Sequence, residues 1–260
     1  HKLTMAKDRF GRSIHYLRIS LTDHCNLRCI YCMPEDIVFR PSQVLMQDEE
    51  ILKLVRLFTR LGIKKYRLTG GEPTVRHNIV DIVHELAHTP GVETLTMTTN
   101  GVLLSDLARP LAEAGLDRVN ISIDTLNPDK FRRLTRRGSV DDVWDGIYAA
   151  QDAGLTPIKL NSVIVSGYNE SDAVDLAQLT LEHTWQVRSI EMMPFAGATD
   201  LQVQHMVTVE NIKATIKSKL GFLQPVNNGL LDGETRLFRL PGALGDIGFI
   251  STISQPFCAD

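Results

Sequence analysis

The stretch Cys25-Asn-Leu-Arg-Cys29-Ile-Tyr-Cys32 places three cysteines within eight residues, in the spacing Cys-x3-Cys-x2-Cys. Soft thiolates on one short loop indicate a metal site. An iron–sulfur cluster normally takes four cysteine ligands, so a loop with three leaves one iron open to an outside ligand. We therefore expect Cys25, Cys29 and Cys32 to hold a 4Fe–4S cluster at the centre of the chemistry.

Two other interpretations of this loop remain open. A structural zinc site needs four protein ligands, usually in two separated pairs, whereas the remaining cysteine, Cys258, lies far away in the chain. His24 adjoins the loop and is a further candidate ligand. Disulfides are disfavoured, because four cysteines in 260 residues are few and three of them are crowded together. We prefer iron–sulfur to zinc, and zinc to inert thiols.

The bulk composition is that of an ordinary globular protein, with 43% hydrophobic and 23% charged residues. The net charge of −3 gives no electrostatic reason to expect binding to nucleic acid or to a membrane. No apolar run is long enough to span a bilayer, and the N-terminal residues contain no signal-peptide core. A reducing compartment suits exposed thiolates, so we expect a cytoplasmic protein, or a protein of an organelle matrix in a eukaryote.

The cysteine loop follows a segment, 15–21, that alternates and is rich in β-formers, which predicts a strand. Strand and helix signals then alternate along the chain. Strands are expected at 65–69, 93–98, 118–123, 157–165 and 187–192, and helices at 51–61, 79–86, 103–114, 143–153 and 172–183. This order predicts parallel strands joined by right-handed crossovers. We expect an α/β fold, a partial (β/α)6 barrel, with a flat doubly wound sheet as the alternative.

The pattern changes near residue 200. A helix is expected at 208–220 and short strands at 222–226, 235–239 and 247–251, separated by Gly, Asn and Asp turns. We therefore expect two domains, a barrel over 1–199 and a small α+β C-terminal extension over 200–260.

The unusual residues fall at the predicted strand ends, where ligands of such folds bind. These segments are the cysteine loop, Gly70-Gly-Glu-Pro73, Thr99-Asn-Gly101 and Ser122-Ile-Asp124. Gly70 and Gly71 permit close backbone approach because they have no Cβ, and Glu72 could accept hydrogen bonds from a ligand ammonium. Taken alone, Gly-Gly-Glu-Pro would be read as a simple turn.

Three cations interrupt strands that should be almost continuously apolar, namely Arg18, Arg67 and Lys159. A buried cation is costly unless it is paired. Three cations directed into one lumen favour a polyanionic ligand, such as a nucleotide phosphate chain. The alternative is internal pairing with Asp124 or Glu191.

Together these motifs resemble the radical S-adenosylmethionine (SAM) enzymes, which carry Cys-x3-Cys-x2-Cys with an aromatic residue, here Tyr31, before the last cysteine. The resemblance is closer to one family, the GTP 3′,8-cyclases of molybdenum cofactor biosynthesis, and covers nearly the whole chain. Its segments here are 16–20, 67–76, 98–101, 120–124, 159–161, 190–193 and 247–250.

The resemblance implies a role for each matching residue. SAM would bind the open iron, and Tyr31, Gly70, Gly71, Glu72, Ser122 and Met193 would surround it. GTP would contact Arg18, Arg67, Thr99 and Lys159, in agreement with the charge argument. The implied reaction is a lyase reaction that forms (8S)-3′,8-cyclo-7,8-dihydroguanosine 5′-triphosphate, after SAM cleavage generates a radical that abstracts hydrogen from C3′.

The family also carries a second 4Fe–4S cluster, and Phe257-Cys258-Ala-Asp260 matches only the start of its motif. We therefore expect the chain to continue beyond Asp260, with Cys258 as a ligand of that cluster. The resemblance further implies an electron donor such as flavodoxin or ferredoxin, and a homodimer.

Two alternatives stay open: a two-cluster radical SAM peptide maturase, and a non-catalytic iron–sulfur protein whose four cysteines close one cluster.

Overall fold

A computed structural model of the chain describes residues 7, 9, 11–193, 205–227 and 231–254. The chain forms two compact units, each assembled from three separate pieces of sequence. The first contains 1–26, 36–120 and 142–156, and the second contains 27–35, 121–141 and 157–260. The expected C-terminal extension therefore shares its unit with the later strands of the expected barrel, and the division into 1–199 and 200–260 remains a prediction.

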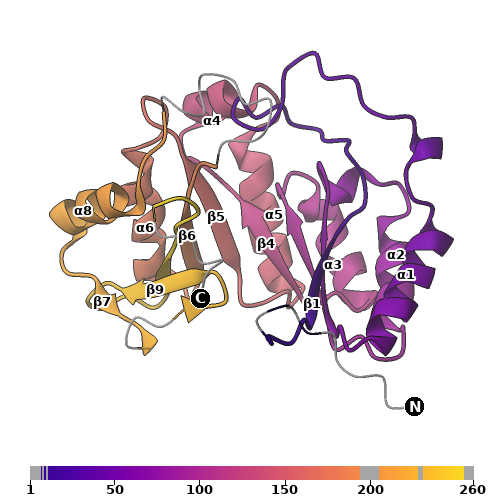
Figure 1. Cartoon of the computed structure of the whole chain (residues 1–260). Coiled ribbons are helices and arrows are strands. Elements are labelled where there is room, and N and C mark those ends of the chain that lie inside the picture. Colours follow the sequence, from indigo (N-terminus) through magenta and orange to yellow (C-terminus); the bar gives the residue numbers. More distant parts are fainter. Residues whose placement is uncertain (1–6, 8, 10, 194–204, 228–230, 255–260) are drawn as a thin grey trace. The chain divides into compact units, whose positions relative to one another are not determined.

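The first unit consists of parallel strands that alternate with helices (Figure 1). Its elements are β1 (Tyr16–Ser20), η1 (Ser42–Val44), α1 (Asp48–Arg60), β2 (Lys65–Thr69), η2 (Pro73–Val75), α2 (Ile79–Ala87), β3 (Thr94–Thr99), α3 (Leu104–Glu113), most of β4 (Arg118–Ser122) and most of α5 (Val140–Asp152). β2 lies between β1 and β3 and pairs in parallel with both. The alternation predicted from the sequence is confirmed here.

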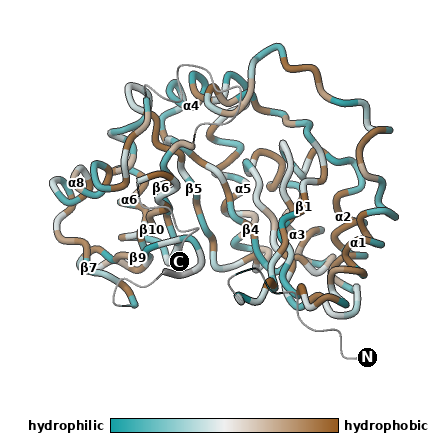
Figure 2. The backbone as a smooth tube through the Cα atoms, in the orientation of Figure 1, coloured by the Kyte–Doolittle hydropathy of each residue, from teal (hydrophilic) through white to brown (hydrophobic). Residues whose placement is uncertain are grey.

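One face of these strands is apolar and packs against the helices. Tyr66 and Leu68 of β2 are buried, and their register neighbours Leu17, Ile19, Leu95 and Met97 lie on the same face. Figure 2 shows hydrophobic residues recurring along α1 and α2 of this unit. Because strand side chains alternate, the residues between them, including Arg67, lie on the opposite face.

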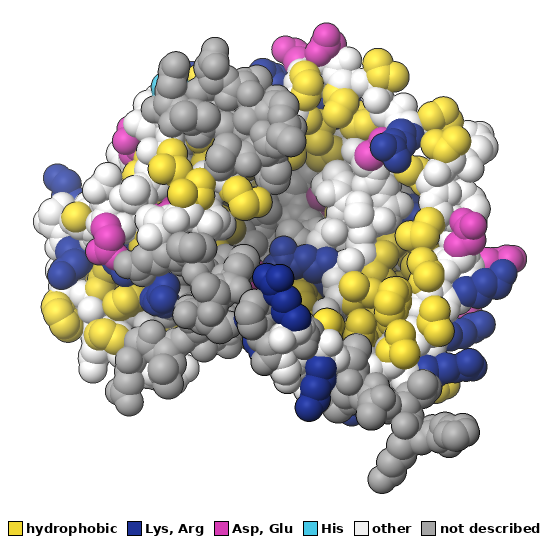
Figure 3. Space-filling view, in the orientation of Figure 1, with side chains coloured by type: hydrophobic (Ala, Val, Ile, Leu, Met, Phe, Trp, Pro, Cys, Tyr) yellow, Lys and Arg dark blue, Asp and Glu magenta, His cyan; other side chains and the backbone are white. Residues whose placement is uncertain are grey.

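Several apolar side chains of the first unit remain exposed, and Figure 3 shows hydrophobic side chains gathered on its surface. They include Val38, Val44, Met46, Leu54 and Leu57. All five belong to the segment from the cysteine loop to the end of α1. Grouped exposed apolar residues are a common feature of interaction surfaces.

The second unit combines parallel and antiparallel strands. Its elements are α4 (Pro128–Thr135), β5 (Lys159–Ile164), α6 (Asp172–Glu182), β6 (Gln186–Glu191), α8 (Val209–Leu220), β7 (Gln224–Pro225), β8 (Leu231–Asp232), β9 (Thr235–Arg239) and β10 (Asp246–Ile250). β6 pairs in parallel with β5 and with β10. β9 is antiparallel to β10, β7 and β8. The α/β fold class with mainly parallel barrel-type strands is confirmed.

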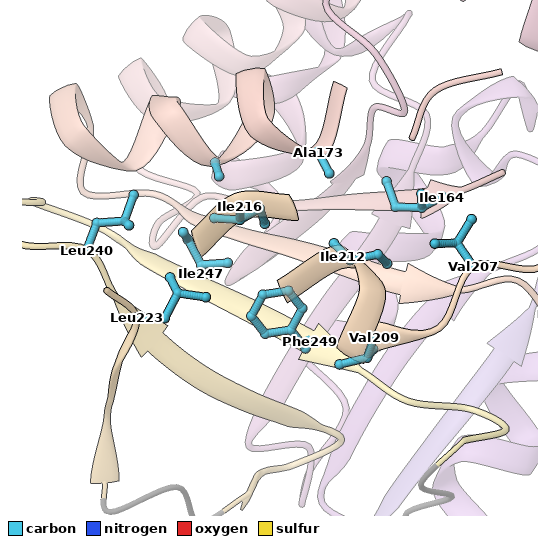
Figure 4. Packing of buried hydrophobic residues seen from close by; sticks show 11 residues of the cluster. Ile164, Ala173, Val207, Val209, Ile212, Ile216, Leu223, Leu240, Ile247 and Phe249 are labelled. Carbon is cyan, nitrogen blue, oxygen red and sulfur yellow. The ribbon is translucent and has the colours of Figure 1, made fainter. Parts of the chain in front are cut away.

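A hydrophobic core joins the later elements of this unit to β5 (Figure 4). Ile212 and Ile216 of α8 pack with Ile247 and Phe249 of β10, and Ile164 at the end of β5 belongs to the same cluster. Residues after 205 are therefore packed onto the strands that precede them. This packing fixes α8 and β10 next to the end of β5.

The sequence analysis did not predict α4. Its signal is present, because Asn127 accepts a hydrogen bond from the Lys130 amide and Pro128 occupies the first turn. Of the short strands expected late in the chain, the one at 222–226 is reduced to β7. Within the described part of the chain, no helix is both long and apolar enough to cross a membrane.

Candidate functional site

The Gly-Gly-Glu-Pro turn at the end of β2 lies against the backbone that leads to Cys25. The Gly71 amide donates a 2.6 Å hydrogen bond to the Thr22 carbonyl. A Cβ on Gly70 would lie 2.5 Å from the Thr22 carbonyl oxygen, and one on Gly71 would lie 2.3 Å from the His24 carbonyl oxygen. The missing Cβ atoms of Gly70 and Gly71 thus let the end of β2 pack against the backbone that follows β1, just before Cys25.

Glu72 organises the same junction from within, since it is only 1% exposed. Its carboxylate accepts hydrogen bonds from the Thr74 amide (3.0 Å), the Thr74 hydroxyl (2.6 Å), the Thr99 hydroxyl (2.7 Å) and the Asn100 amide (2.6 Å). Burial raises the pKa of Glu72, and these hydrogen bonds only partly oppose that effect. The carboxylate therefore ties the end of β2 to the end of β3.

Asn100 carries this network to the cysteine loop and was missed by the sequence analysis. Its side-chain amide donates to Asn26 Oδ1 at 2.7 Å and lies 3.9 Å from Cys25 Sγ. The Thr-Asn-Gly turn flagged at the end of β3 was the available signal. A pocket of about 430 Å³ borders Cys25, with Leu21, Thr22, His24, Asn26, Asp48, Arg76, His77 and Asn78 among its lining residues.

Two of the predicted substrate cations are neighbours in the first unit. Arg18 and Arg67 occupy the same register position of β1 and β2. Arg18 Nε donates to the Tyr16 hydroxyl at 3.0 Å, and the Arg67 guanidinium lies 5.5 Å from the centre of the Tyr16 ring. Arg67 Nε also donates to the Thr96 hydroxyl at 3.2 Å. Two of the residues predicted to contact the substrate are therefore neighbours on one strand face.

In the second unit, Tyr31 of the cysteine loop is joined to two strand ends through Asp124. The Tyr31 hydroxyl donates to Asp124 Oδ2 at 2.6 Å, and the Val163 amide donates to Asp124 Oδ1 at 2.9 Å. Asn169 Nδ2 donates to the Asp124 carbonyl at 2.8 Å. Burial raises the pKa of Asp124 to about 6, although the hydrogen bonds from the Tyr31 hydroxyl and the Val163 amide lower it. Asp124 therefore fixes Tyr31 next to β4 and β5.

The loop around Cys29 is also held by the end of α4. The Arg28 amide donates to the Thr135 carbonyl, and the Ile30 amide donates to the Leu134 carbonyl, each at 2.9 Å. These two bonds lie immediately before and after Cys29. The helix that the sequence analysis missed is thus the support of this part of the loop.

Lys159 shares a strand face with a second cation, Arg188, which the sequence analysis missed. Lys159 and Asn161 lie on one face of β5, and Asn161 is the register partner of Arg188 on β6. Gly248 of β10 is also opposite Arg188, and a Cβ there would lie 2.7 Å from Arg188 Cγ. The glycine leaves room for the arginine stem. The signal was a cation inside a strand, the same rule that identified Lys159.

The remaining predicted site residues are placed as follows. Ser122 is half-buried at the end of β4, and Met193 is exposed just after β6. Cys258 lies outside the described residues.

The three loop cysteines have the chemistry and exposure of ligands for an iron–sulfur cluster. Cys25 and Cys29 are half-buried and Cys32 is exposed. Cys25 belongs to the first unit and the other two belong to the second. Among the described residues, no three His, Cys, Asp or Glu side chains are gathered around a common point where an ion could bind. The thiols fit the cluster by their donor type, on a loop whose backbone is fixed at both ends.

Known protein families and individual proteins resemble this chain in sequence. The model of the Radical SAM superfamily matches residues 19–180. Proteins named GTP 3′,8-cyclase from Petrotoga mobilis and Moorella thermoacetica are each 46% identical to the chain, over 253 and 254 residues. Each match covers 97% of this chain and 78% of the relative.

Solved structures agree in fold at much lower identity. A radical SAM methyltransferase from Sphaerobacter thermophilus superposes with a TM-score of 0.62 at 17% identity, covering 78% of this chain and 63% of that protein. Streptococcus suis SuiB bound to S-adenosylmethionine gives 0.60 at 18% identity, covering 72% of this chain and 43% of SuiB. These structures support the fold alone, and the closer sequence relatives give the family. The chain belongs to the radical SAM superfamily and, within it, to the GTP 3′,8-cyclase family.

Proposed function

We propose that the chain is a lyase that converts GTP to (8S)-3′,8-cyclo-7,8-dihydroguanosine 5′-triphosphate, the first step of molybdenum cofactor biosynthesis. The observation that carries this proposal is the match to GTP 3′,8-cyclases over 97% of the chain at 46% identity. The cations of β1, β2, β5 and β6 support it, because a triphosphate needs several positive partners.

In this proposal Cys25, Cys29 and Cys32 hold the first 4Fe–4S cluster. When bound, the cluster and SAM supply the radical chemistry that joins C3′ of the nucleotide to C8. Tyr31, Gly70, Gly71, Ser122 and Met193 are the proposed contacts of SAM, and the hydrogen bond to Asp124 orients Tyr31. Glu72 serves the cofactor by fixing the turn, since its carboxylate accepts four hydrogen bonds from protein donors.

Two pairs of cations are the candidate contacts of GTP, and each pair lies within one unit. Arg18 with Arg67, and Lys159 with Arg188, each occupy one strand face. Guanidinium groups can bind phosphate oxygens in a bidentate manner, which favours arginine at such positions. Thr99 completes the proposed set at the end of β3.

Further parts of the proposal concern cofactors and partners. Cys258 would hold a second 4Fe–4S cluster, and a small protein such as flavodoxin or ferredoxin would supply the electron. A homodimer is supported by the exposed apolar residues of the first unit (Figure 3). The cytoplasm remains the proposed compartment, because thiolates and iron–sulfur clusters persist in a reducing environment.

The decisive experiment uses the anaerobically reconstituted and reduced protein with SAM and GTP, ATP or no nucleotide. We expect 5′-deoxyadenosine to form with GTP, together with a cyclised GTP product identified by mass spectrometry. Cleavage of SAM that is indifferent to the nucleotide would favour the peptide maturase alternative. If a protein shown to hold its cluster does not cleave SAM, a closed cluster with four cysteine ligands would be favoured. Only that alternative predicts that substitution of Cys258 abolishes the single cluster.

Variants of the strand cations test the substrate assignment. We expect Lys159→Gln to raise the KM for GTP at least tenfold, because one phosphate partner is lost, with little change in the affinity for SAM. Lys219→Gln is the matched control, since Lys219 is exposed on α8. An unchanged KM for GTP in Lys159→Gln would remove Lys159 from the site.

A further inference from the structure

Helix α4 ends in a backbone conformation that its sequence does not favour. Arg136, the residue after the helix, has φ 60° and ψ −18°, in the left-handed region, and its amide donates to the Arg132 carbonyl. Left-handed backbone is costly for a residue that carries a Cβ and is usually assigned to glycine. Such a conformation persists only where surrounding contacts hold it, so the contacts of Arg136 indicate what it does.

The side chain of Arg136 reaches back to the cysteine loop within the same unit. Its Nη1 atom lies 3.2 Å from the Arg28 carbonyl and 3.3 Å from the Met33 carbonyl, and donates to both. These carbonyls lie on either side of the segment that carries Cys29 and Cys32. Its Nε atom lies 3.8 Å from the Glu35 carboxylate, which is largely exposed and contributes little.

Arg136 completes a set of four hydrogen bonds between the end of α4 and the loop. The other two run from the loop amides of Arg28 and Ile30 to carbonyls of the last helical turn. The helix end therefore accepts from the loop with its backbone and donates to the loop with a side chain. Within the described part of the chain, the contacts of Arg136 run to the loop and to its own helix.

We propose that Arg136 is a positioning residue that pre-arranges Cys29 and Cys32 for the first cluster, before the cluster binds. The left-handed backbone at the end of α4 directs the guanidinium to both carbonyls. The side chain therefore links the two ends of the loop, whereas a glycine at this position would not. This inference rests on the proposed function only in assigning a cluster to the two cysteines. The protein itself orders the loop, through Arg136, before any cluster is bound.

The test replaces Arg136 with glycine, which suits the left-handed backbone but removes the two hydrogen bonds from the guanidinium to the loop. We expect the amide hydrogens of residues 28–33 to exchange at least tenfold faster in Arg136→Gly than in the wild type, as measured by hydrogen–deuterium exchange on the full chain without its cluster. Exchange in β5 and β6 should not change. Arg132→Ala, an exposed arginine of the same helix, is the matched control and should behave like the wild type.

A second readout follows the cluster directly. Arg136→Gly should take up iron and sulfide at least fivefold more slowly and give a broader electron paramagnetic resonance signal after reduction. Arg136→Lys should recover part of both properties, because one ammonium can still donate to the two carbonyls. If loop exchange in Arg136→Gly equals that of the wild type, Arg136 is only a helix end and the proposal is wrong, whether or not GTP is cyclised.

Discussion

Glu72 in the first unit and Glu191 in the second are both shielded from solvent, but Glu72 lies deeper in its unit and the two accept from different donors. Each is 1% exposed and lies at or just after the end of a strand. Glu72 accepts from two backbone amides and two hydroxyls. Glu191 accepts from three backbone amides and one hydroxyl, those of Val209 (2.8 Å), Ile253 (3.0 Å) and Ser254 (3.0 Å) and the Ser254 side chain.

The ionisation of the two carboxyls differs. Burial raises the pKa of Glu72, and its hydrogen bonds do not overcome that effect. Burial acts in the same direction on Glu191, but there the bonds from Ser254, Val209 and Ile253 prevail and lower the pKa. Four hydrogen bonds therefore do not have one fixed effect on a buried carboxylate, because the result depends on how deeply the group is buried. This difference can be tested.

The largest effect is expected for Glu191→Ala. Three backbone amides would lose their acceptor, at the start of α8 and in the segment 253–254 that leads towards Cys258. Each unsatisfied buried donor costs roughly 1–3 kcal/mol, so we expect a total loss of about 4 kcal/mol in the free energy of unfolding. Urea denaturation would measure it, with exposed Glu182→Ala as the control. A loss below about 1 kcal/mol would show that water replaces the carboxylate.

A smaller effect is expected for glutamine at each position. At Glu72 one carboxylate oxygen accepts from the Thr74 amide and the other from the Asn100 amide, so a glutamine NH2 must face a backbone donor in either orientation. At Glu191 the Val209 amide donates to one oxygen and the Ile253 and Ser254 amides donate to the other, so the same holds. Because a backbone amide cannot reverse, each variant should cost about 2 kcal/mol in the free energy of unfolding. A cost near zero in the same denaturation experiment would show that the amide donors are satisfied without the carboxylate.

The same contrast shows what the sequence could predict. The alternation of strands and helices followed from local periodicity, and Gly70-Gly-Glu-Pro73 stood out because its residue types are rare together at a strand end. Arg18, Arg67 and Lys159 stood out because cations do not belong in such strands, and the register confirms that Arg18 and Arg67 are neighbours. Features that depend on local composition were therefore predictable.

The partners of the flagged residues were not predictable, because they come from distant segments. Tyr31 and Asp124 are 93 residues apart in sequence, and nothing local pairs them. Asp124 and Glu191 were considered as counter-ions of the strand cations, and their hydrogen-bond donors include Tyr31 for Asp124 and backbone amides for both. Arg136 gave no signal, since an arginine after a helix does not disclose a left-handed backbone or a contact with a cysteine loop.

The dependence of stability on pH gives the finest test of the comparison. A lowered pKa in the folded chain means that Glu191 stabilises the fold above its ordinary pKa and loses this contribution as pH falls through the lowered value. A raised pKa gives the opposite sign, so the contribution of Glu72 is greatest at low pH and is lost as pH rises through the raised value.

The difference in melting temperature between wild type and Glu191→Gln should therefore shrink from pH 6 to pH 4, whereas the difference for Glu72→Gln should grow over the same range. Both variants lose the same titratable group, so each serves as the control for the other. Slopes of the same sign would mean that the hydrogen bonds of Glu191 do not outweigh its burial, and the contrast between the two carboxyls would then fail.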